Sequence, residues 1–399
     1  MEADVLDTID PHLLGERIAE SRRARRLTQQ QVADALDLSR ATVVATEKGE
    51  RRPKARELVA LSRLFGRPVG DFVAARPLNG EPGFIVHFDR ALKTLSTEAT
   101  EGLGPAIERF ERHCRWYVEL EEMLGAPHPQ RWPEPYDIEG TPLDRAAEEV
   151  AISERNRLGL GDGPVSNLAD LLESDVGLRV IPVEMGGTEV TTMYLMTARY
   201  GACIAVNEAR SGDIDVAHAY AHFLTNRQRP EICQSRTPGR MSHEERFADA
   251  FASAFLMPAS GVQRRFEAVR RAKRGKTITP ADVLMLASLY RVPLPAMARR
   301  IEDLRLLPAG TSRRMEQPGI SGERPVSHGS RFTTRYTTLA VQAFEEGLLT
   351  EGQLAERLGT DIIGARAIVE GLTEGYRTGR DGHAERVSLD LSADLLGAD

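Results

Sequence analysis

Long apolar segments are absent from this sequence. No stretch of the 399 residues approaches the roughly 20 apolar residues that a transmembrane helix needs. The first residues also lack the charged segment followed by an apolar segment that is typical of a secretory signal. The sequence therefore predicts neither a membrane-spanning nor an exported protein, and we expect a cytoplasmic one.

Cysteine is scarce as well. The three cysteines, Cys114, Cys203 and Cys233, are odd in number and widely spaced. This pattern predicts neither a disulfide framework nor a cysteine-based zinc site. We expect three buried free thiols, as is usual in a reducing compartment where disulfides are rare.

Positive charge is in deficit, because 52 Lys and Arg face 59 Asp and Glu and give a net charge of −7. Residues 12–75 are the exception, with 13 basic and 8 acidic side chains, a net of +5 that leaves −12 for the rest. A basic module on an acidic body predicts that only this module meets a polyanion such as DNA.

The basic module contains five short amphipathic segments. Thr28 and Ser39 are good N-caps for two successive helices, and Gly49 terminates the second of them. Two short helices joined by a tight turn inside a basic module form a helix-turn-helix.

This segment resembles the XRE, or phage-repressor-like, family. The resemblance is carried by Leu27-Thr28-Gln29, Val32-Ala33, Leu38-Ser39, Val43, Glu47-Lys48-Gly49-Glu50, Arg52-Pro53 and Leu61 to Phe65. It implies that residues 39–48 form the recognition helix, which lies in the major groove of double-stranded DNA. Because such modules usually bind palindromic operators as dimers, we expect a homodimer. The family also pairs Arg22 with Glu47, which ties the first helix to the recognition helix.

Individual DNA contacts follow from side-chain chemistry. Arg40 suits a bidentate contact with guanine, and small apolar side chains suit thymine methyl groups. Basic residues at the end of the helix suit phosphates, which set affinity rather than sequence preference. The resemblance adds Gln29, at the start of the preceding helix, as a contact to the DNA backbone. The predicted DNA-binding residues are then Gln29, Ser39, Arg40, Ala41, Val44, Ala45, Lys48, Arg51 and Arg52.

A second feature lies in the middle of the chain. His218 and His222 are four residues apart in a helical pattern, so their imidazoles can converge on one zinc ion. This spacing alone is a weak signal. A later helical segment that ends at Pro258 presents Glu245 and Asp249 on one polar face, and a zincin takes its third ligand from such a second helix.

Together the two segments resemble the ImmA/IrrE-like zinc metallopeptidases, which carry A-H-E-x-x-H-x-L and then E-x-x-A-[ND]-x-F-A-x-x-[LF]-L-M-P. This chain has Ala217-His218-Ala219-Tyr220-Ala221-His222-Phe223-Leu224, then Glu245, Ala248-Asp249, Phe251-Ala252 and Phe255-Leu256-Met257-Pro258. The resemblance covers roughly residues 146–310. It implies one Zn²⁺ per chain, held by His218, His222 and Glu245. His243 is a further candidate ligand, although a surface position near a helix start is favoured.

The glutamate of the family motif is missing. The family's general base falls on Ala219, which cannot accept a proton. Because losing a general base costs about 10²–10⁴-fold in rate, we expect this chain to hydrolyse peptides poorly. Two interpretations stay open: a natural pseudo-peptidase kept as a sensor or docking surface, or a deliberate Glu→Ala change in an active parent.

The fold class that we expect is mainly α with a small β-sheet (α+β). Strands are predicted at 178–183, 189–197 and 202–206, and a flexible insert over 226–243. The predicted organisation is a flexible tail (1–11), the helix-turn-helix domain (12–75), a linker and long helix (76–142), the metallopeptidase-like domain (143–310), a linker (311–330), a helical C-terminal domain (331–375) and a loosely ordered tail (376–399).

Three functions fit these features. We favour a DNA-binding transcriptional regulator whose zinc metallopeptidase-like domain acts as sensor or protease. The first alternative is a regulated zinc protease that cleaves a repressor, a toxin or itself, and that is inactive here because of Ala219. The second is a non-enzymatic antitoxin or defence-system switch that binds a partner protein.

Overall fold

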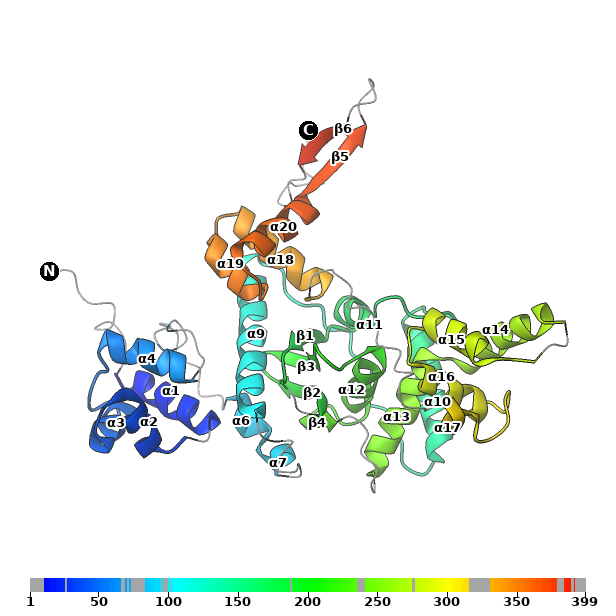
Figure 1. The fold of residues 1–399 in the computed structure, drawn as a ribbon, viewed down its shortest axis with the longest axis horizontal. Coiled ribbons are helices and arrows are strands. Elements are labelled where there is room, and N and C mark those ends of the chain that lie inside the picture. Colours follow the sequence, from blue (N-terminus) through cyan, green and yellow to red (C-terminus); the bar gives the residue numbers. More distant parts are fainter. Residues whose placement is uncertain are drawn as a thin grey trace. The chain divides into compact units, whose positions relative to one another are not determined.

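The computed structural model describes residues 11–25, 27–65, 69, 72, 83–93, 95, 100, 102–186, 189–234, 241–274, 277–315, 331–378, 384–388 and 391. The chain divides into two compact units, an N-terminal unit (residues 1–111 and 185–188) and a C-terminal unit (112–184 and 189–399) (Figure 1). Residues 1–10 of the predicted N-terminal tail, and most of the fifth helix predicted around Val69, lie outside the described residues. The domain limits given above remain predictions.

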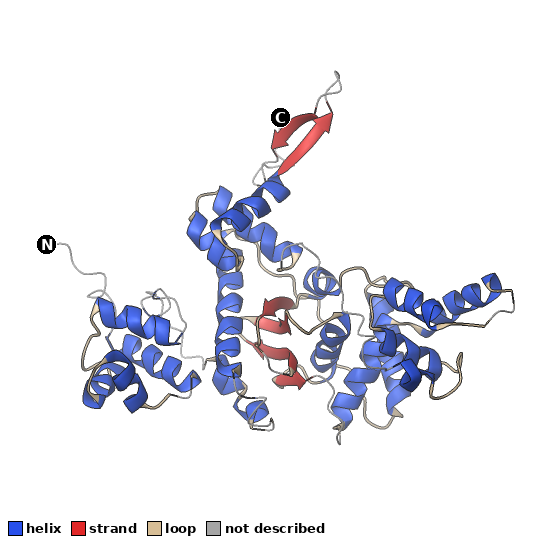
Figure 2. Ribbon diagram, viewed as in Figure 1, coloured by secondary structure: helices blue, strands red, loops and turns tan. Residues whose placement is uncertain are grey.

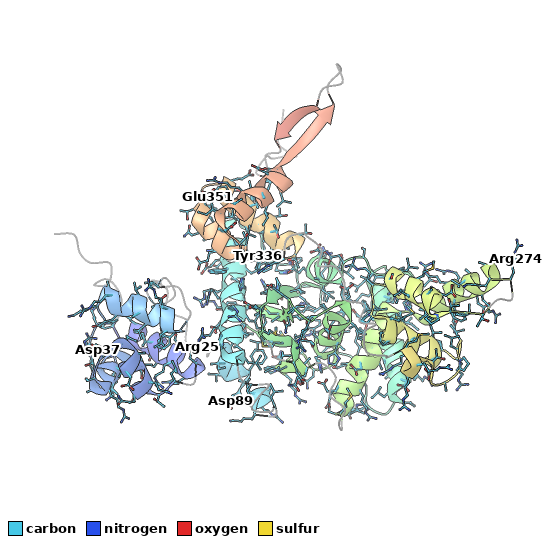
Figure 3. All side chains as sticks on the ribbon, viewed as in Figure 1. Arg25, Asp37, Asp89, Arg274, Tyr336 and Glu351 are labelled. Carbon is cyan, nitrogen blue, oxygen red and sulfur yellow. The ribbon has the colours of Figure 1, made fainter. Side chains whose placement is uncertain are left out.

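The helix-turn-helix elements form where their caps predict. The helices are α1 (Pro11–Ala24), α2 (Gln29–Leu36), α3 (Arg40–Glu47) and α4 (Ala55–Phe65). Thr28 and Gln31 make a capping box at the start of α2, and the Ser39 hydroxyl accepts the Thr42 amide at the start of α3. Asp37, labelled in Figure 3, makes the turn between these two helices with a left-handed φ of 54°.

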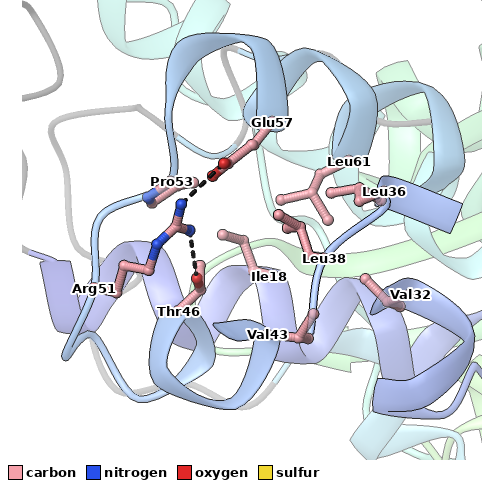
Figure 4. A pocket seen from close by; sticks show the side chains of 10 residues that line it. All are labelled: Ile18, Val32, Leu36, Leu38, Val43, Thr46, Arg51, Pro53, Glu57 and Leu61. Atoms are coloured by element: carbon pink, nitrogen blue, oxygen red, sulfur yellow. Dashed lines mark hydrogen bonds and ion pairs between the residues drawn. The ribbon is translucent and has the colours of Figure 1, made fainter. Parts of the chain in front are cut away.

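A small apolar core holds these helices together. Its buried members include Leu14, Val43 and Phe65. Gly15 lets α1 approach the end of α3, since a Cβ there would lie 2.5 Å from the Thr46 carbonyl oxygen. A small hollow remains in this core (Figure 4), and it is lined by Ile18, Val32, Leu36, Leu38, Val43, Thr46, Arg51, Pro53, Glu57 and Leu61.

Two short helices and one long helix follow. They are α6 (Phe84–His87), α7 (Asp89–Leu92) and α9 (Leu103–Met123). The apolar stripe predicted for the long helix is buried from Ile107 to Leu120, whereas Met123 at its end is 43% exposed. The proline-rich segment after it forms neither helix nor strand, as expected for an extended connector.

A four-stranded mixed sheet forms the centre of the C-terminal unit (Figure 2). Its strands are β1 (Arg179–Val183), β2 (Val190–Thr197), β3 (Gly201–Asn207) and β4 (Glu231–Gln234), in the order β1-β3-β2-β4. Strands β1 and β3 are parallel, and the other pairs are antiparallel. The three predicted strands are confirmed. Strand β4 was not predicted, and it lies inside the segment expected to be a flexible insert.

Helices cover this sheet and complete the core. They include α10 (Leu143–Arg157), α11 (Leu168–Leu171), the π-helix η2 (Leu172–Val176), α12 (Asp213–Thr225) and α13 (His243–Leu256). Helix α12 packs on the sheet and on α13, and α13 also packs on α10. The aromatic rings of Phe251 and Phe255 stack at 5.3 Å, and Tyr220 contacts both. The helices α14 (Ala259–Ala272), α15 (Pro280–Leu289), α16 (Leu294–Asp303) and α17 (Thr311–Met315) follow.

The C-terminal helices α18 (Thr334–Glu345), α19 (Glu351–Arg357) and α20 (Ile362–Thr373) are confirmed as a small bundle. Arg335 and Arg357 tie the bundle to α9 through ion pairs with Glu121 and Glu119, at 2.7 and 3.0 Å. Beyond it, β5 (Glu374–Thr378) and β6 (Ala384–Ser388) pair as an antiparallel hairpin. These two strands lie largely within the segment predicted as a loosely ordered tail, and that prediction is not tested for the rest of the segment.

The predicted fold class, mainly α with a small sheet, is confirmed. Among the residues that the structure describes, no helix is both long and apolar enough to cross a membrane.

Candidate metal centre and nucleic-acid interface

Helix α12 carries both predicted histidine ligands. The helix begins after Gly212, whose amide donates to the Asp215 carboxylate at 2.9 Å and so caps the first turn. The small side chains Ala217 and Ala221 are fully buried and let the helix pack closely. The imidazole of His222 is 4% exposed and that of His218 is 12% exposed, so both rings face the interior.

Helix α13 brings a carboxylate to the same place. Its N-cap is Ser242, whose hydroxyl accepts the Glu245 amide at 3.1 Å. The two Glu245 carboxylate oxygens lie 3.2 Å from His218 Nε2 and 3.4 Å from His222 Nε2. The two Nε2 atoms are themselves 3.1 Å apart. The three predicted ligands are thus brought together, and their role in binding metal remains a prediction.

A second carboxylate on α13 orients the first histidine. Asp249 Oδ1 lies 3.0 Å from His218 Nδ1. When Nδ1 donates its proton to this carboxylate, Nε2 keeps a lone pair that points toward Glu245 and His222. Metal-ligating histidines commonly have such an orienting partner. Glu245 and Asp249 lie one helical turn apart on the same polar face and have different roles. Glu245 faces both imidazoles, whereas Asp249 orients the ring of His218.

Strand β4 adds a thiol that no sequence pattern placed here. Cys233 is buried, and its Sγ lies with an imidazole nitrogen of His218 and of His222 in a cluster whose ligand atoms are all within 4.8 Å of one another. All three cysteines are buried and none forms a disulfide, as predicted. No spacing in the sequence indicated that Cys233 would face the histidines, because the strand carrying it was not predicted.

Electrostatic interactions couple the pKa values of four side chains, those of His218, His222, Cys233 and Glu245. Burial lowers the pKa of His218, but the neighbouring thiol and carboxylates outweigh burial and raise it well above its usual value. Burial also lowers the pKa of His222, which Cys233 and Glu245 raise to about 9. Burial raises the pKa of the Cys233 thiol, yet the two imidazoles bring it down to about 7. Burial likewise raises the pKa of Glu245, but hydrogen bonds from both imidazoles hold it far below its usual range. The anionic thiol and carboxyl are favoured by positive charge between them, which a bound cation would also supply.

The position of the missing base is fully buried. Ala219 belongs to the apolar core of the C-terminal unit and offers only a methyl group. His243 is exposed at the first residue of α13 and is not part of the metal-ligand cluster found among the described residues. The structure therefore gives no support to His243 as a fourth ligand.

Most predicted DNA-contacting residues of α3 are accessible. Arg40, Ala41 and Lys48 are exposed, whereas Val44 and Ala45 are partly exposed. Two further residues are also exposed, Ser39, which is at the same time the cap of α3, and Arg52. The exposed Arg40 lies beside small apolar side chains, a combination that suits a major groove.

Two other residues that were predicted to contact DNA form hydrogen bonds within the domain instead. Arg51 donates to Glu57 at 2.9 Å and to Thr46 at 3.3 Å, and its side chain is 29% exposed. Gln29 donates to Glu47 at 2.8 Å. These internal bonds make both weaker candidates for DNA contact than the exposed residues of α3.

The predicted pair of the first and third helices is confirmed. Arg22 Nε lies 2.6 Å from the Glu47 carboxylate, and Arg22 also donates to the Leu27 carbonyl at 2.9 Å. Glu47 thus receives hydrogen bonds from both Arg22 and Gln29, and it fixes the end of α3 against α1 and α2.

Comparison with known families agrees with the description of both the helix-turn-helix segment and the metallopeptidase-like segment. Residues 18–72 match the helix-turn-helix family, and residues 174–302 match the IrrE N-terminal-like domain, which is a peptidase family. The chain joins an XRE-type helix-turn-helix domain to an ImmA/IrrE-like metallopeptidase domain. It is a DNA-binding transcriptional regulator with a protease-like domain.

The ImmA/IrrE-like match spans the whole cluster. It begins before β1 and ends within α16, so it includes the strand with Cys233 and both helices with the histidines and Glu245. Peptidases of this family are typically metal-dependent, which agrees with the presence of a possible His/His/Cys cluster.

A solved structure gives no further information. The crystal structure of PlcR from Bacillus thuringiensis, in complex with a peptide and DNA, aligns with 90% of this chain and 99% of its own, at 12% identity. Its TM-score of 0.18 is too low to indicate a shared overall fold. No curated protein matches this chain.

Proposed function

We propose that this protein is a cytoplasmic regulator that binds an operator through α3 and uses its ImmA/IrrE-like domain to sense a metal ion rather than to cleave peptides. The observation that supports this is an intact set of donors beside a missing base. His218, His222 and Glu245 converge, whereas position 219 carries a methyl group. Selection for hydrolysis would need the base, whereas selection for metal binding needs only the donors.

The donor set fits a zinc ion. Two imidazoles and one carboxylate are the ligands that Zn²⁺ takes in metallopeptidases, and imidazole does not suit Mg²⁺ or Ca²⁺. In an active peptidase a bound zinc ion would supply a Lewis acid. Here His218, His222 and Glu245 would hold the ion, and Asp249 would orient the first imidazole.

DNA binding rests on the exposed face of α3. We expect Arg40 to contact a guanine, and Ala41, Val44 and Ala45 to contact thymine methyl groups. Lys48 is expected to contact phosphate. A homodimer would bind a palindromic operator with half-sites about one helical turn apart.

The test has two parts. Binding sites would first be selected from random DNA duplexes with the full-length protein. Affinity for the selected duplex would then be measured by fluorescence anisotropy, with one equivalent of zinc and after removal of metal with a chelator. We expect metal removal to change affinity in the parent protein, and not in a His218→Ala, His222→Ala variant. Equal affinity with and without metal would overturn the sensor function and leave DNA binding intact.

A regulated protease is the second candidate, and a specific observation favours it. The orienting contact between His218 and Asp249 is retained at 3.0 Å, as catalysis would require of a parent enzyme with glutamate at position 219. The test is the Ala219→Glu variant with zinc, incubated with the products of neighbouring genes. A discrete, chelator-sensitive cleavage would establish this candidate in place of the sensor.

A further inference from the structure

We propose that Cys233 is a fourth metal ligand, which closes the site of the ImmA/IrrE-like domain and gives it a thiolate. This inference rests on the proposed metal binding by His218, His222 and Glu245. It concerns which atoms complete the site, and therefore whether a bound ion has any position left for water.

The backbone of β4 fixes where the thiol can point. Strand β4 is an edge strand, paired antiparallel to β2, with Cys233 opposite Thr192. The Thr191 hydroxyl also donates to the Cys233 carbonyl oxygen, at 3.5 Å. The Cys233 side chain is consequently held at one place and not on a free loop.

The thiol approaches the same two imidazoles as Glu245 does. The Cys233 Sγ lies within 4.8 Å of an imidazole nitrogen of His218 and of His222, and the Glu245 carboxylate oxygens lie 3.2 and 3.4 Å from the same two imidazoles. The three cluster atoms of the thiol and the imidazoles lie within 4.8 Å of one another, and Cys233 is 4% exposed. A thiol on β4 and a carboxylate on α13 therefore approach the same pair of imidazoles.

The other two cysteines show that this placement is particular to Cys233. The Cys203 thiol donates to the Tyr200 carbonyl oxygen at 3.3 Å, as buried thiols commonly do. Cys114 is buried in the apolar stripe of α9. Of the three cysteines, all of which the structure describes, Cys233 alone belongs to a group of side chains that could hold a metal ion.

The number of donors decides the chemistry. Zinc is most often four-coordinate, and catalytic sites keep one position open for water, whereas sites with four protein ligands are closed. Two imidazoles, a carboxylate and a thiolate make four. A closed site has no position for a hydrolytic water, which explains why such a domain can lose its general base without losing its metal. A thiolate also favours zinc over harder cations.

The test uses cobalt(II) as a spectroscopic substitute for zinc in the full-length protein. One equivalent of Co²⁺ should give the near-ultraviolet charge-transfer band of a thiolate-bound cobalt ion. Cys233→Ser should remove the band, and Cys203→Ser, the matched control, should keep it. Zinc affinity, measured by competition with a chromophoric chelator, should fall in Cys233→Ser by more than the roughly 10–100-fold that loss of an orienting group costs. Circular dichroism would show that each variant is folded.

The outcomes separate the two proposals. If the protein binds one cobalt ion without the band, or if Cys233→Ser leaves band and affinity unchanged, Cys233 is not a ligand and the three-residue site stands. If no metal binds to the parent protein at one equivalent, both the closed site and the metal-sensing function are overturned.

Discussion

The two proposed sites of this protein are built in opposite ways. On α3, Arg40 and Lys48 are exposed, and the polar groups beneath them, such as Arg22 and Glu47, bond to one another. In the metal centre, the two imidazoles are mostly buried, the Glu245 and Asp249 carboxylates are 33% and 24% exposed, and each functional side chain contacts another: His218 contacts Glu245, Asp249 and His222. An exposed site for a large partner is marked by groups left outside the internal hydrogen-bond network. A buried site for a small ion is marked by several charged groups held against one another.

This difference has an energetic consequence. Removing an exposed α3 residue should change DNA binding and leave stability alone, because its partner is not part of the protein. Removing a member of the buried cluster should change both metal binding and stability, because its neighbours lose a partner. The following predictions use this contrast.

Salt should produce the largest effect and should separate the two sites. A protein with about 6–10 phosphate contacts loses roughly 10³–10⁵ in DNA affinity between about 50 and 200 mM salt. Zinc affinity in the same series should change by less than about tenfold, because buried charges are screened little. Anisotropy on the selected duplex and chelator competition would measure the two. Operator affinity that does not depend on salt would contradict an exposed electrostatic interface.

Restoring the base should have the next largest effect, and only when the site is also opened. The double variant Ala219→Glu, Cys233→Ser should hydrolyse an unfolded casein substrate about 10²–10⁴-fold faster than Cys233→Ser alone, because a general base becomes available. Ala219→Glu alone should remain slow, since the thiolate still occupies the fourth position. Equal activity of Ala219→Glu alone and of the double variant would show that Cys233 does not close the site. Because position 219 is fully buried, thermal unfolding of each variant is the necessary control.

A pair of arginines tests the contrast inside one domain. Arg40→Ala should weaken operator binding by about 10–100-fold, the value of a bidentate guanine contact, and leave thermal unfolding unchanged. Arg51→Ala should instead lower the free energy of unfolding by about 1–2 kcal/mol, because it leaves Glu57 with a single amide donor, that of Lys54. Anisotropy and calorimetry on both variants would measure this. If Arg51→Ala abolishes binding at full stability, then Arg51 is a DNA contact after all.

The smallest predicted effect is a pH dependence set by Glu173, which is buried in the C-terminal unit. Burial raises the pKa of Glu173 to about 7, although Thr333, the Val180 amide, Tyr117 and Arg335 all favour its charged form. The folded state then binds a proton that the unfolded state releases, so the contribution of Glu173 to stability is largest below pH 4.5 and is lost as pH rises toward 7.

The measurement is thermal unfolding of Glu173→Gln and of the parent protein between about pH 5 and pH 8. The variant should gain stability relative to the parent as pH rises. Glu57→Gln is the matched control, because the hydrogen bond from Arg51 lowers the pKa of Glu57 and its contribution is lost on acidification. Identical pH profiles for parent and Glu173→Gln would contradict the raised pKa.

A structural feature could be predicted from the sequence when the residues that cause it lie close together in the chain. The α2 and α3 helices were predicted because Thr28 and Ser39 cap them through residues three positions away. The convergence of His218, His222 and Glu245 was predicted from two helical motifs with a strong family resemblance. Both inferences used information that lies within a few residues of each element.

The missed features have distant causes. Strand β4 is only four residues long, and it is a strand because β2 offers it a partner about 40 residues earlier in the chain. The position of Cys233 beside the histidines therefore could not be predicted from spacing.

The contact at Gly15 has a consequence for how this protein can change. The end of α3 lies against the bare backbone of α1, where a single methyl group would meet the carbonyl oxygens of Thr46 and Glu47 at 2.5 and 2.6 Å. Any larger residue at position 15 would push the end of α3 away from α1. It would thereby shift the helix that we propose enters the major groove. We therefore expect that a mutation at Gly15, which alters no charge, weakens operator binding as much as loss of Arg40, the residue proposed to contact guanine.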